Sequence, residues 1–355
     1  NIKSTLIDKK NLTVRVKNWF DFSDLNEYIL HWKVTGDDGT VLAEGNKEVA
    51  CEPHATVELT LGAVQLPNTI REAYLDLGWT RKKSTPLVDT AWEIAYDQFV
   101  LPASGKVWNG KPSEAGKTTF EVDENTGALK SLCLDGEELL ASPVTISLFR
   151  PATDNDNRDR MGAKLWRKAG LHTLTQKVVS LKESKTSATA QVNILNVTGK
   201  KVGDATLEYT LNHNGSLKVQ TTFQPDTTWV KSIARLGLTF EMNDTYGNVT
   251  YLGRGEHETY IDRNQSGKIG IYTTTPEKMF HYYVIPQSTG NRTDVRWVKL
   301  ADDSGKGCWI ESDSPFQFSA LPFSDLLLEK ALHINDLERN GRITVHLDAK
   351  QAGVG

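Results

Sequence analysis

The sequence has few cysteines and no long apolar run, and each shortage excludes classes of protein. Its 355 residues include only Cys51, Cys133 and Cys308, which lie far apart and form no C-x-x-C pair. An odd, scattered set argues against a disulfide framework and against structural zinc, so we expect three reduced, mostly buried thiols. No stretch reaches the roughly 18–20 apolar residues of a membrane helix, so we expect a soluble chain without a membrane partner.

The sequence also lacks an excess of positive charge. The chain carries 41 Lys and Arg against 45 Asp and Glu, a net charge of −4. Nothing here builds the basic stripe that phosphate backbones require, which makes nucleic acid a poor candidate partner. The eight histidines are dispersed, and no H-E-x-x-H, G-x-S-x-G or glycine-rich phosphate loop is present. We therefore expect no metal and no cofactor in this chain.

The pattern that is present is β almost throughout, in a chain long enough for two domains. Apolar and polar residues alternate over 12–19, 28–34, 56–61, 72–79 and 91–101, and residues 36–39 form a hairpin signal. About seven short strands in roughly 100 residues is the spacing of an immunoglobulin-like β-sandwich. Small and polar residues around Pro102 predict a linker, so we place this first domain at residues 1–103.

Residues 104–355 continue the β pattern, with examples at 118–122, 188–194 and 207–211 and turns at 123–127, 135–136 and 214–215. So many strands predict two large antiparallel sheets packed face to face. Two segments differ. Residues 159–169 read as a short helix, and residues 324–332 read as another, with Ser324 as its N-cap.

The tract at 253–263 has the densest set of candidate site residues. If it is extended, alternate side chains share one face and could line a sugar groove. The side chains on this face would be those of Glu256, Glu258, Tyr260 and Asp262, with His257 and Arg263 beside them. The alternative is a polar edge or loop whose acids pair with Arg254, Arg263 and Arg292.

Two other features suggest ligands less directly. Asp154, Asn155 and Asp156 carry oxygens that suit a cation, but an Asx turn that bonds its own backbone explains them equally. Nine tryptophans could stack on sugar rings. Those on strand-like alternation are expected in the core: Trp19, Trp32, Trp79 and Trp92. The pattern does not place Trp108, Trp166, Trp297 and Trp309.

Several ordered motifs resemble the C-terminal part of the glycoside hydrolase family 2 β-galactosidases. GRGEHETYIDR (253–263) and YVIPQSTGNRTDVRW (283–297) are similar to motifs of their small-chain domain, as are FRPATDND (149–156), LWRKAGL (165–171) and DAKQAGVG (348–355). VKNWFDFSDL (16–25), His31-Trp32 and GTVLAEG (39–45) resemble the sandwich after their catalytic barrel. The resemblance implies an all-β chain in which residues 104–355 form a galactose-mutarotase-like β-supersandwich.

The resemblance also implies what lies elsewhere in the family. Both catalytic glutamates and the magnesium ligands are on a barrel that precedes position 1, so no residue here inherits a catalytic role. The family continues past position 355 with an Asp- and Trp-bearing loop and closing strands. Ser288-Thr289 departs from the Glu-Asn that commonly follows Pro-Gln. We therefore expect an excised piece of a longer protein, itself cytoplasmic or periplasmic.

Three hypotheses about function follow. In the first, the chain is the non-catalytic region of a β-galactosidase that packs against the barrel, shapes the galactoside site and takes part in a homo-oligomer. In the second, the large domain binds galactosides by itself through the 253–263 tract, Arg292 and a nearby aromatic such as Trp297. In the third, it acts like a mutarotase, with Glu258 and His257 as acid and base, although adjacent strand residues point to opposite faces.

Overall fold

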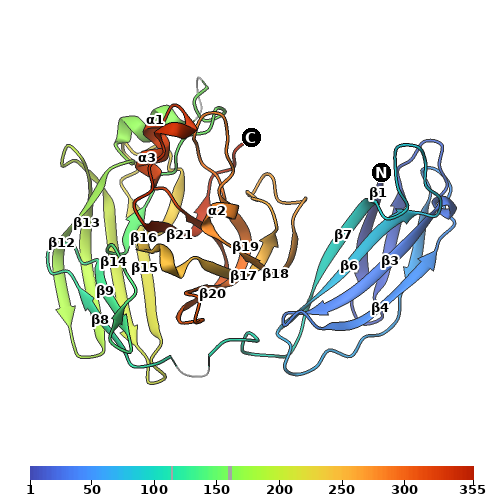
Figure 1. The fold of residues 1–355 in the computed structure, drawn as a ribbon, viewed down its shortest axis with the longest axis horizontal. Helices are drawn as coiled ribbons and strands as arrows, with labels where there is room; N and C mark the ends of the chain where they lie inside the picture. The colour runs from blue at the N-terminus through green and yellow to red at the C-terminus, as the bar shows by residue number, and fades with distance from the viewer. Residues whose placement is uncertain (113–114, 159–161) are drawn as a thin grey trace. The chain divides into compact units, whose positions relative to one another are not determined.

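The computed structural model describes residues 1–112, 115–158 and 162–355, and this part of the chain forms two compact units. Asn1–Lys111 makes up most of the first unit, and Pro112–Lys268 with Tyr272–Gly355 makes up the second. Both are built almost entirely of antiparallel strands, so the predicted all-β class is confirmed (Figure 1). No described helix is long and apolar enough to cross a membrane.

The first unit is a sandwich of two sheets. One has the strand order β1-β2-β5 and the other β4-β3-β6-β7. The strands are β1 (Ile2–Asp8), β2 (Thr13–Asn18), β3 (Tyr28–Gly36), β4 (Val41–Glu48), β5 (Thr56–Thr60), β6 (Glu72–Arg81) and β7 (Glu93–Pro102), with the 3-10 turn η1 (Leu25–Glu27). Alternate residues such as Val14 and Val16 in β2 and Leu75 and Leu77 in β6 are buried in one core. This is the alternation that the sequence shows.

Residues 104–111 also belong to the first unit, eight residues beyond the boundary expected at 103. The N–H of Gly105 donates to the Ile70 carbonyl at 2.8 Å, and Asn109 Nδ2 donates to Asp37 Oδ1 at 2.7 Å. The Arg71 guanidinium lies 4.3 Å from the ring centre of Trp108, which is buried. The linker-like composition around Pro102 gives no sign of these contacts.

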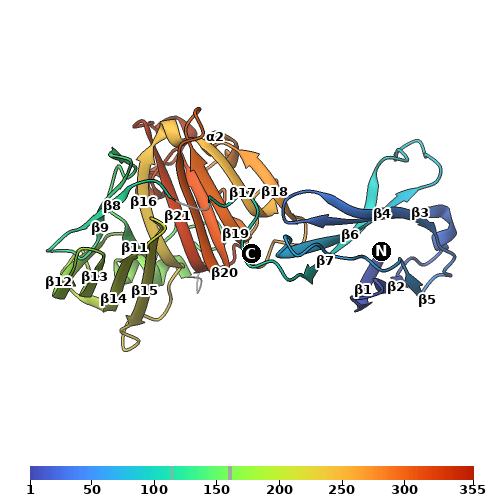
Figure 2. The same ribbon diagram turned by 90° about the horizontal axis from the view of Figure 1, so that it is seen from below.

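The second unit contains three sheets. A seven-stranded sheet has the order β11-β16-β21-β20-β19-β17-β18, a four-stranded sheet runs β12-β13-β14-β15, and a small sheet runs β10-β9-β8. Figure 2 shows the strands of the large sheet side by side. The strands are β8 (Thr118–Val122), β9 (Leu129–Leu134), β10 (Glu137–Glu138), β11 (Thr145–Ser147), β12 (Leu174–Glu183), β13 (Ser187–Asn196), β14 (Lys201–Leu211), β15 (Leu217–Pro225), β16 (Arg235–Asn243), β17 (Asn248–Gly255), β18 (Lys268–Thr274), β19 (Arg292–Ala301), β20 (Gly307–Leu321) and β21 (Arg342–Gln351).

One core joins the three sheets. Ala190 and Val192 of β13, Phe240 of β16 and Val345 of β21 belong to the same apolar cluster. Because strand residues alternate between faces, the neighbours of Val345 point away from this core. Thr344 and His346 on either side of Val345, and Asp348 two positions beyond His346, are polar yet at most 7% exposed. The large sheet therefore has one apolar and one polar buried face.

Short helices and turns lie in the connections between strands. The helices are α1 (Gly162–Ala169), α2 (Pro276–Met279) and α3 (Asp325–Lys330), with 3-10 turns η2 (Asp244–Tyr246) and η3 (Ile334–Asp336). α3 confirms the second predicted helix, and the Ser324 side chain accepts the Leu327 N–H as its cap. α1 confirms the first from residue 162 onward, whereas 159–161 lie outside the described residues. The hairpin between β3 and β4 also forms, with Gly39 at φ +83°.

The tryptophans only partly match the prediction. Trp79 is 1% exposed, as expected, but Trp19 is 57% and Trp92 67% exposed, so their assignment to the core was wrong. β2 ends at Asn18 and β7 begins at Glu93, so both side chains lie just outside the strand whose pattern they appear to continue. Trp32 is half-buried. All three cysteines are free thiols, with Cys51 buried and the other two half-buried.

Candidate functional site

The 256–263 segment is a loop, not the extended strand that the shared-face prediction required. β17 ends at Gly255, and Tyr260 and Arg263 close a turn through two backbone hydrogen bonds. Glu258 and Tyr260 are buried, whereas Glu256 and Asp262 are exposed. The four side chains therefore do not share one face, because the chain leaves the sheet before the acidic residues begin.

Glu258 is the centre of this region. Its carboxylate accepts the Gly290 N–H at 2.8 Å and the Thr289 hydroxyl at 3.1 Å, and it also accepts hydrogen bonds from Tyr283 and Arg263. Burial raises the pKa of Glu258, but the hydrogen bonds from Tyr283, Gly290 and Arg263 and the charge of Arg263 outweigh burial and hold the pKa below its usual value. The ionised side chain thus ties the 256–263 loop to the 281–291 loop.

Backbone pairing strengthens the same junction. The Thr259 N–H donates to the Asn291 carbonyl at 2.8 Å, and Asn291 Nδ2 returns a hydrogen bond to the Thr259 carbonyl at 2.9 Å. The Thr293 N–H donates to Thr259 Oγ1 at 2.9 Å, and Asn291 also donates to Gln317. Folding buries these polar groups and removes their hydrogen bonds to water. The hydrogen bonds within the protein replace them. The two loops therefore form one ordered unit on β19 and β20.

Two residues that the sequence analysis proposed for sugar contact are buried inside the domain. Arg292 is 2% exposed and donates from Nε to the Tyr251 hydroxyl at 3.0 Å and from Nη1 to the Gly290 carbonyl at 3.1 Å. Trp297 is 4% exposed and stacks on Trp309 with ring centres 4.2 Å apart. Arg292 supports the 281–291 loop from inside the domain, and both side chains are almost fully buried.

The remaining predicted residues lie at the surface of the loop pair. His257 contacts Ser266 Oγ at 2.7 Å, and Asp262 accepts the N–H groups of Val354 and Gly355 at 2.9 and 2.8 Å. Of the expected acid–arginine pairs, Glu258–Arg263 forms, Arg254 pairs with Asp294 instead, and Arg292 pairs with no acid in the described part of the chain.

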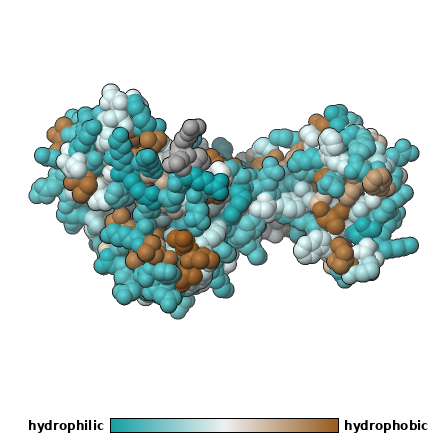
Figure 3. All heavy atoms as spheres, turned by 90° about the horizontal axis from the view of Figure 1, so that it is seen from above, coloured by the Kyte–Doolittle hydropathy of each residue, from teal (hydrophilic) through white to brown (hydrophobic). Residues whose placement is uncertain are grey.

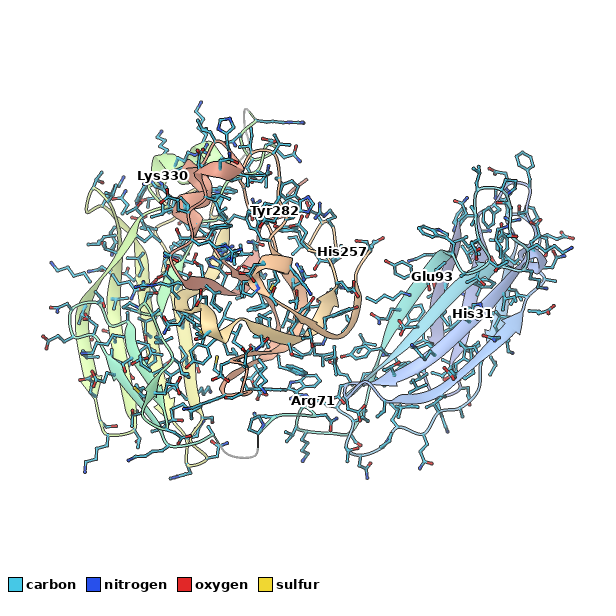
Figure 4. All side chains as sticks on the ribbon, viewed as in Figure 1. His31, Arg71, Glu93, His257, Tyr282 and Lys330 are labelled. Carbon is cyan, nitrogen blue, oxygen red and sulfur yellow. The ribbon has the colours of Figure 1, made fainter. Side chains whose placement is uncertain are left out.

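The loop pair also exposes apolar side chains, which the sequence analysis did not single out. We call them the loop face; they are Ile261 (58%), Tyr282 (52%), Val284 (88%) and Ile285 (49%). His257 and Tyr282 mark the two loops in Figure 4. On the side that Figure 3 shows, most of the larger unit is hydrophilic and apolar side chains gather in small patches. The loop face brings four of the exposed large apolar side chains of this unit onto one pair of joined loops.

The second candidate site is a turn that bonds to itself. Asp156 is buried, and its carboxylate accepts from Arg150 at 2.6 and 3.2 Å and from the Thr153 N–H and hydroxyl at 2.8 Å. Asn155 Nδ2 donates to the Val354 carbonyl, and Asp154 is exposed. The Arg150 guanidinium thus occupies the position beside the Asp156 carboxylate that a bound cation would need. No group of three or more His, Cys, Asp or Glu side chains suited to a metal occurs among residues 1–112, 115–158 and 162–355.

Sequence reasoning missed a buried charged cluster on the polar face of the large sheet. Arg235 Nη1 donates to Asp325 at 3.0 Å and to His346 Nδ1 at 2.6 Å, and its Nε lies 3.0 Å from Asp348. Burial raises the pKa of Asp348 to about 6, even with Arg235 beside it. These residues are spread over more than 100 positions. The one signal in the sequence was the polar alternation of Thr344, His346 and Asp348 in an otherwise apolar strand.

Comparisons with known proteins agree with this architecture. Residues 114–355 match the family model for the β-galactosidase small chain, and residues 14–102 match that for β-galactosidase domain 4. β-Galactosidases of Priestia megaterium and Aeromonas hydrophila are 29% and 27% identical over 100% and 99% of this chain. A solved exo-chitosanase of Amycolatopsis orientalis overlaps 77% of this chain and 26% of its own at 12% identity, with a TM-score of 0.23 too low to use.

The coverage is unequal between the chain and its relatives. The chain spans 36% of the length of the P. megaterium and A. hydrophila enzymes, although nearly all of its own residues align. The small-chain model alone covers well over half of the chain, and the domain 4 model covers most of the first unit. The chain therefore belongs to the β-galactosidase small-chain family.

Proposed function

We propose that these two units are a non-catalytic region of a β-galactosidase that hydrolyses terminal β-galactosides. In this proposal the loop face packs against the catalytic barrel and shapes one wall of the sugar site. The catalytic carboxylates and any magnesium would then belong to that barrel, as the resemblance to family 2 implies. Any subunit contacts of a homo-oligomer would form between copies of the complete enzyme.

The observation that carries this proposal is the loop face on its Glu258 support. A surface that buries a carboxylate with four donors is ordered before any partner binds, so little conformational entropy is lost on docking. Val284, at 88% exposure, and the other three side chains of the loop face gain from burial against another protein surface. Arg292 and Trp297 are buried, which favours a protein partner over direct sugar stacking.

The geometry does not favour the mutarotase alternative at Glu258 and His257. All four donors to Glu258 come from the protein, and its side chain is 9% exposed. His257 is exposed and contacts Ser266. A general acid–base pair must reach the same substrate from both sides. A saturated, buried carboxylate and a surface imidazole do not form such a pair.

A chimeric enzyme tests the proposal. This chain replaces the aligned third of the P. megaterium β-galactosidase, and hydrolysis of a nitrophenyl β-galactoside is measured. We expect an active chimera and no hydrolysis by the chain alone. The double variant Val284→Asp and Ile285→Asp should lower activity more than about tenfold, because two charges would be buried at the docked surface.

The control places a charge on another exposed valine, Val197→Asp, outside the loop face. This variant should keep the activity of the unmodified chimera. Equal activity of the control and the double variant would show that the loop face does not dock. An inactive unmodified chimera, or hydrolysis by the purified chain alone, would contradict the proposal itself.

A further inference from the structure

A cavity of about 390 Å³ lies on the polar side of the large sheet, entirely within the second unit. Its volume falls in the ~300–1,000 Å³ range of small-molecule sites. The polar side chains on its wall come from β11, β16, β21 and α3: Ser147, Thr239, Glu241, Thr344, His346 and Asp325. Apolar residues, among them Leu148, Phe149, Leu171 and Leu326, also line it. The cavity thus combines hydroxyls, carboxylates and an imidazole with apolar surface.

The charges on this wall cancel. Asp325 accepts from Arg235 at 3.0 Å, and Glu241 Oε2 accepts from Arg342 at 2.8 Å. Each carboxylate therefore has a guanidinium partner, with Arg235 shared between Asp325 and Asp348, and neither needs a cationic ligand for compensation. An anionic ligand would meet the two carboxylates first. The electrostatics favour a neutral molecule.

The imidazole is neutral as well. Arg235 Nη1 lies 2.6 Å from His346 Nδ1, and a guanidinium only donates, so Nδ1 must accept. The proton of His346 is then on Nε2, which lies 3.2 Å from Asp325 Oδ1. Arg235, which does not line the cavity, thus contacts the two lining residues His346 and Asp325, and these two also contact each other.

Polar atoms on the wall still lack partners. Nδ1 of His172, a second imidazole of the lining, has no hydrogen bond within the described chain. That ring packs edge-on against Phe149, with ring centres 5.9 Å apart. Glu241 Oε1 also has no hydrogen bond among the described residues, while Oε2 holds Arg342. A polar group left without a partner favours a ligand that carries hydroxyls.

From this cavity we infer a binding site for a neutral polyhydroxylated molecule of monosaccharide size. Ligand hydroxyls donate to the Glu241 and Asp325 carboxylates and exchange hydrogen bonds with Ser147 and Thr344. The C–H face of the ligand packs on Leu326 and Phe149. This site is separate from the loop face and does not depend on the proposed function.

Saturation-transfer NMR of the whole chain tests the inference, with D-galactose, D-glucose and myo-inositol as probes. Leu326→Trp adds bulk at the cavity mouth, where Leu326 is 38% exposed. Leu332→Trp is the matched control, because Leu332 is exposed and does not line the cavity. We expect transfer to at least one probe, unchanged in Leu332→Trp and at least about tenfold weaker in Leu326→Trp.

A second variant keeps the test valid if the first alters folding. His172→Phe preserves the ring contact with Phe149 and removes both ring nitrogens, so it should also weaken binding. Absence of transfer to all three probes would overturn the inference. Transfer that survives Leu326→Trp and His172→Phe would do so too, because the sugar would then bind elsewhere. Tighter binding of galactose 6-phosphate than of galactose would contradict the neutral ligand.

Discussion

The backbone N–H of Gly290 donates to the Glu258 carboxylate at 2.8 Å, across 32 positions of the chain. This bond joins two loops that follow different elements, β17 and α2. Glu258 also collects the side chains of Tyr283, Thr289 and Arg263. A single buried charge thereby sets the conformation of the surface that we propose docks against a catalytic barrel.

Glu258→Gln should therefore destabilise the second unit. The neutral amide keeps the shape of the side chain but loses the charge that Arg263, Tyr283 and Gly290 stabilise, and we expect a loss of about 2–3 kcal/mol. Urea denaturation of the second unit measures the change. Glu256→Gln is the control, since Glu256 is exposed, and should stay within about 0.5 kcal/mol.

The same substitution should change the response to acid. Because the pKa of folded Glu258 is lowered, its ionised form stabilises the fold above the unfolded value of 4.5, and this contribution is lost as pH falls through the folded pKa. The gap in stability between unmodified chain and Glu258→Gln should therefore narrow as pH drops from 7 to below 4. A gap that is constant with pH would mean that folding does not change the pKa of Glu258.

Asp348 should give the opposite pH dependence. Burial raises its pKa to about 6 from 3.8, so the folded state binds the proton more tightly than the unfolded state. Stability from this group is therefore lost as pH rises from about 4 to 6, by roughly 3 kcal/mol in total. Asp348→Asn mimics the protonated acid, so it should gain stability relative to the unmodified chain over this range.

Denaturation of both proteins at pH 4, 5, 6 and 7 tests that expectation. Asp313→Asn removes an exposed carboxylate from β20 of the same sheet and controls for the change in net charge. A relative stability of Asp348→Asn that falls with rising pH would show that Arg235, 3.0 Å away, outweighs burial.

Gly290→Ala should disturb the loop pair through sterics alone. Gly290 has φ +74°, and an added Cβ would lie 2.6 Å from Leu321 Cδ2 and 2.8 Å from the Met279 carbonyl oxygen. We expect a loss of about 2–4 kcal/mol, from the left-handed conformation and the clash together. Thermal unfolding measures it.

Gly136→Ala separates the two contributions. Gly136 has φ +84°, but a Cβ there meets nothing within 4 Å. This control should lose only about 1 kcal/mol, from conformation. Equal losses at both positions would mean that Met279 and Leu321 move aside freely.

Alternation along the sequence predicted the strands well where a strand has one face in a core. Val14 and Val16 in β2 are examples, and both belong to the core of the first unit. The pattern says less about where a strand ends. Trp19 and Trp92 continue the alternation in the sequence, but both lie outside the sheet. Trp19 follows the end of β2, and Trp92 precedes the start of β7. Strand ends depend on the neighbouring strand, which a local pattern does not contain.

The candidate site was harder to predict for a related reason. The tract around Glu258 was found because acids, His, Tyr and Arg crowd together in the sequence. The extended conformation predicted for it was wrong, because the partners that fix the loop, Thr289 and Gly290, lie some 30 residues away in the sequence. The cluster of Arg235, Asp325 and His346 has only one local signal, the polar alternation around His346 in β21. Only the pairing of β16 with β21 and the placement of α3 bring these residues together.

The contrast between Trp79 and Trp92 gives a last test, within the first unit. Trp79 of β6 is 1% exposed and belongs to the core with Leu30 and Leu77, so Trp79→Ala should cost about 3–5 kcal/mol. Trp92 is 67% exposed ahead of β7, and Trp92→Ala should change stability by less than about 0.5 kcal/mol. Urea denaturation followed by far-UV circular dichroism measures both, with the transition of each unit fitted separately. If Trp92→Ala cost more than about 1.5 kcal/mol, its ring would be packed in solution, and the strand pattern would have been right to place it in the core.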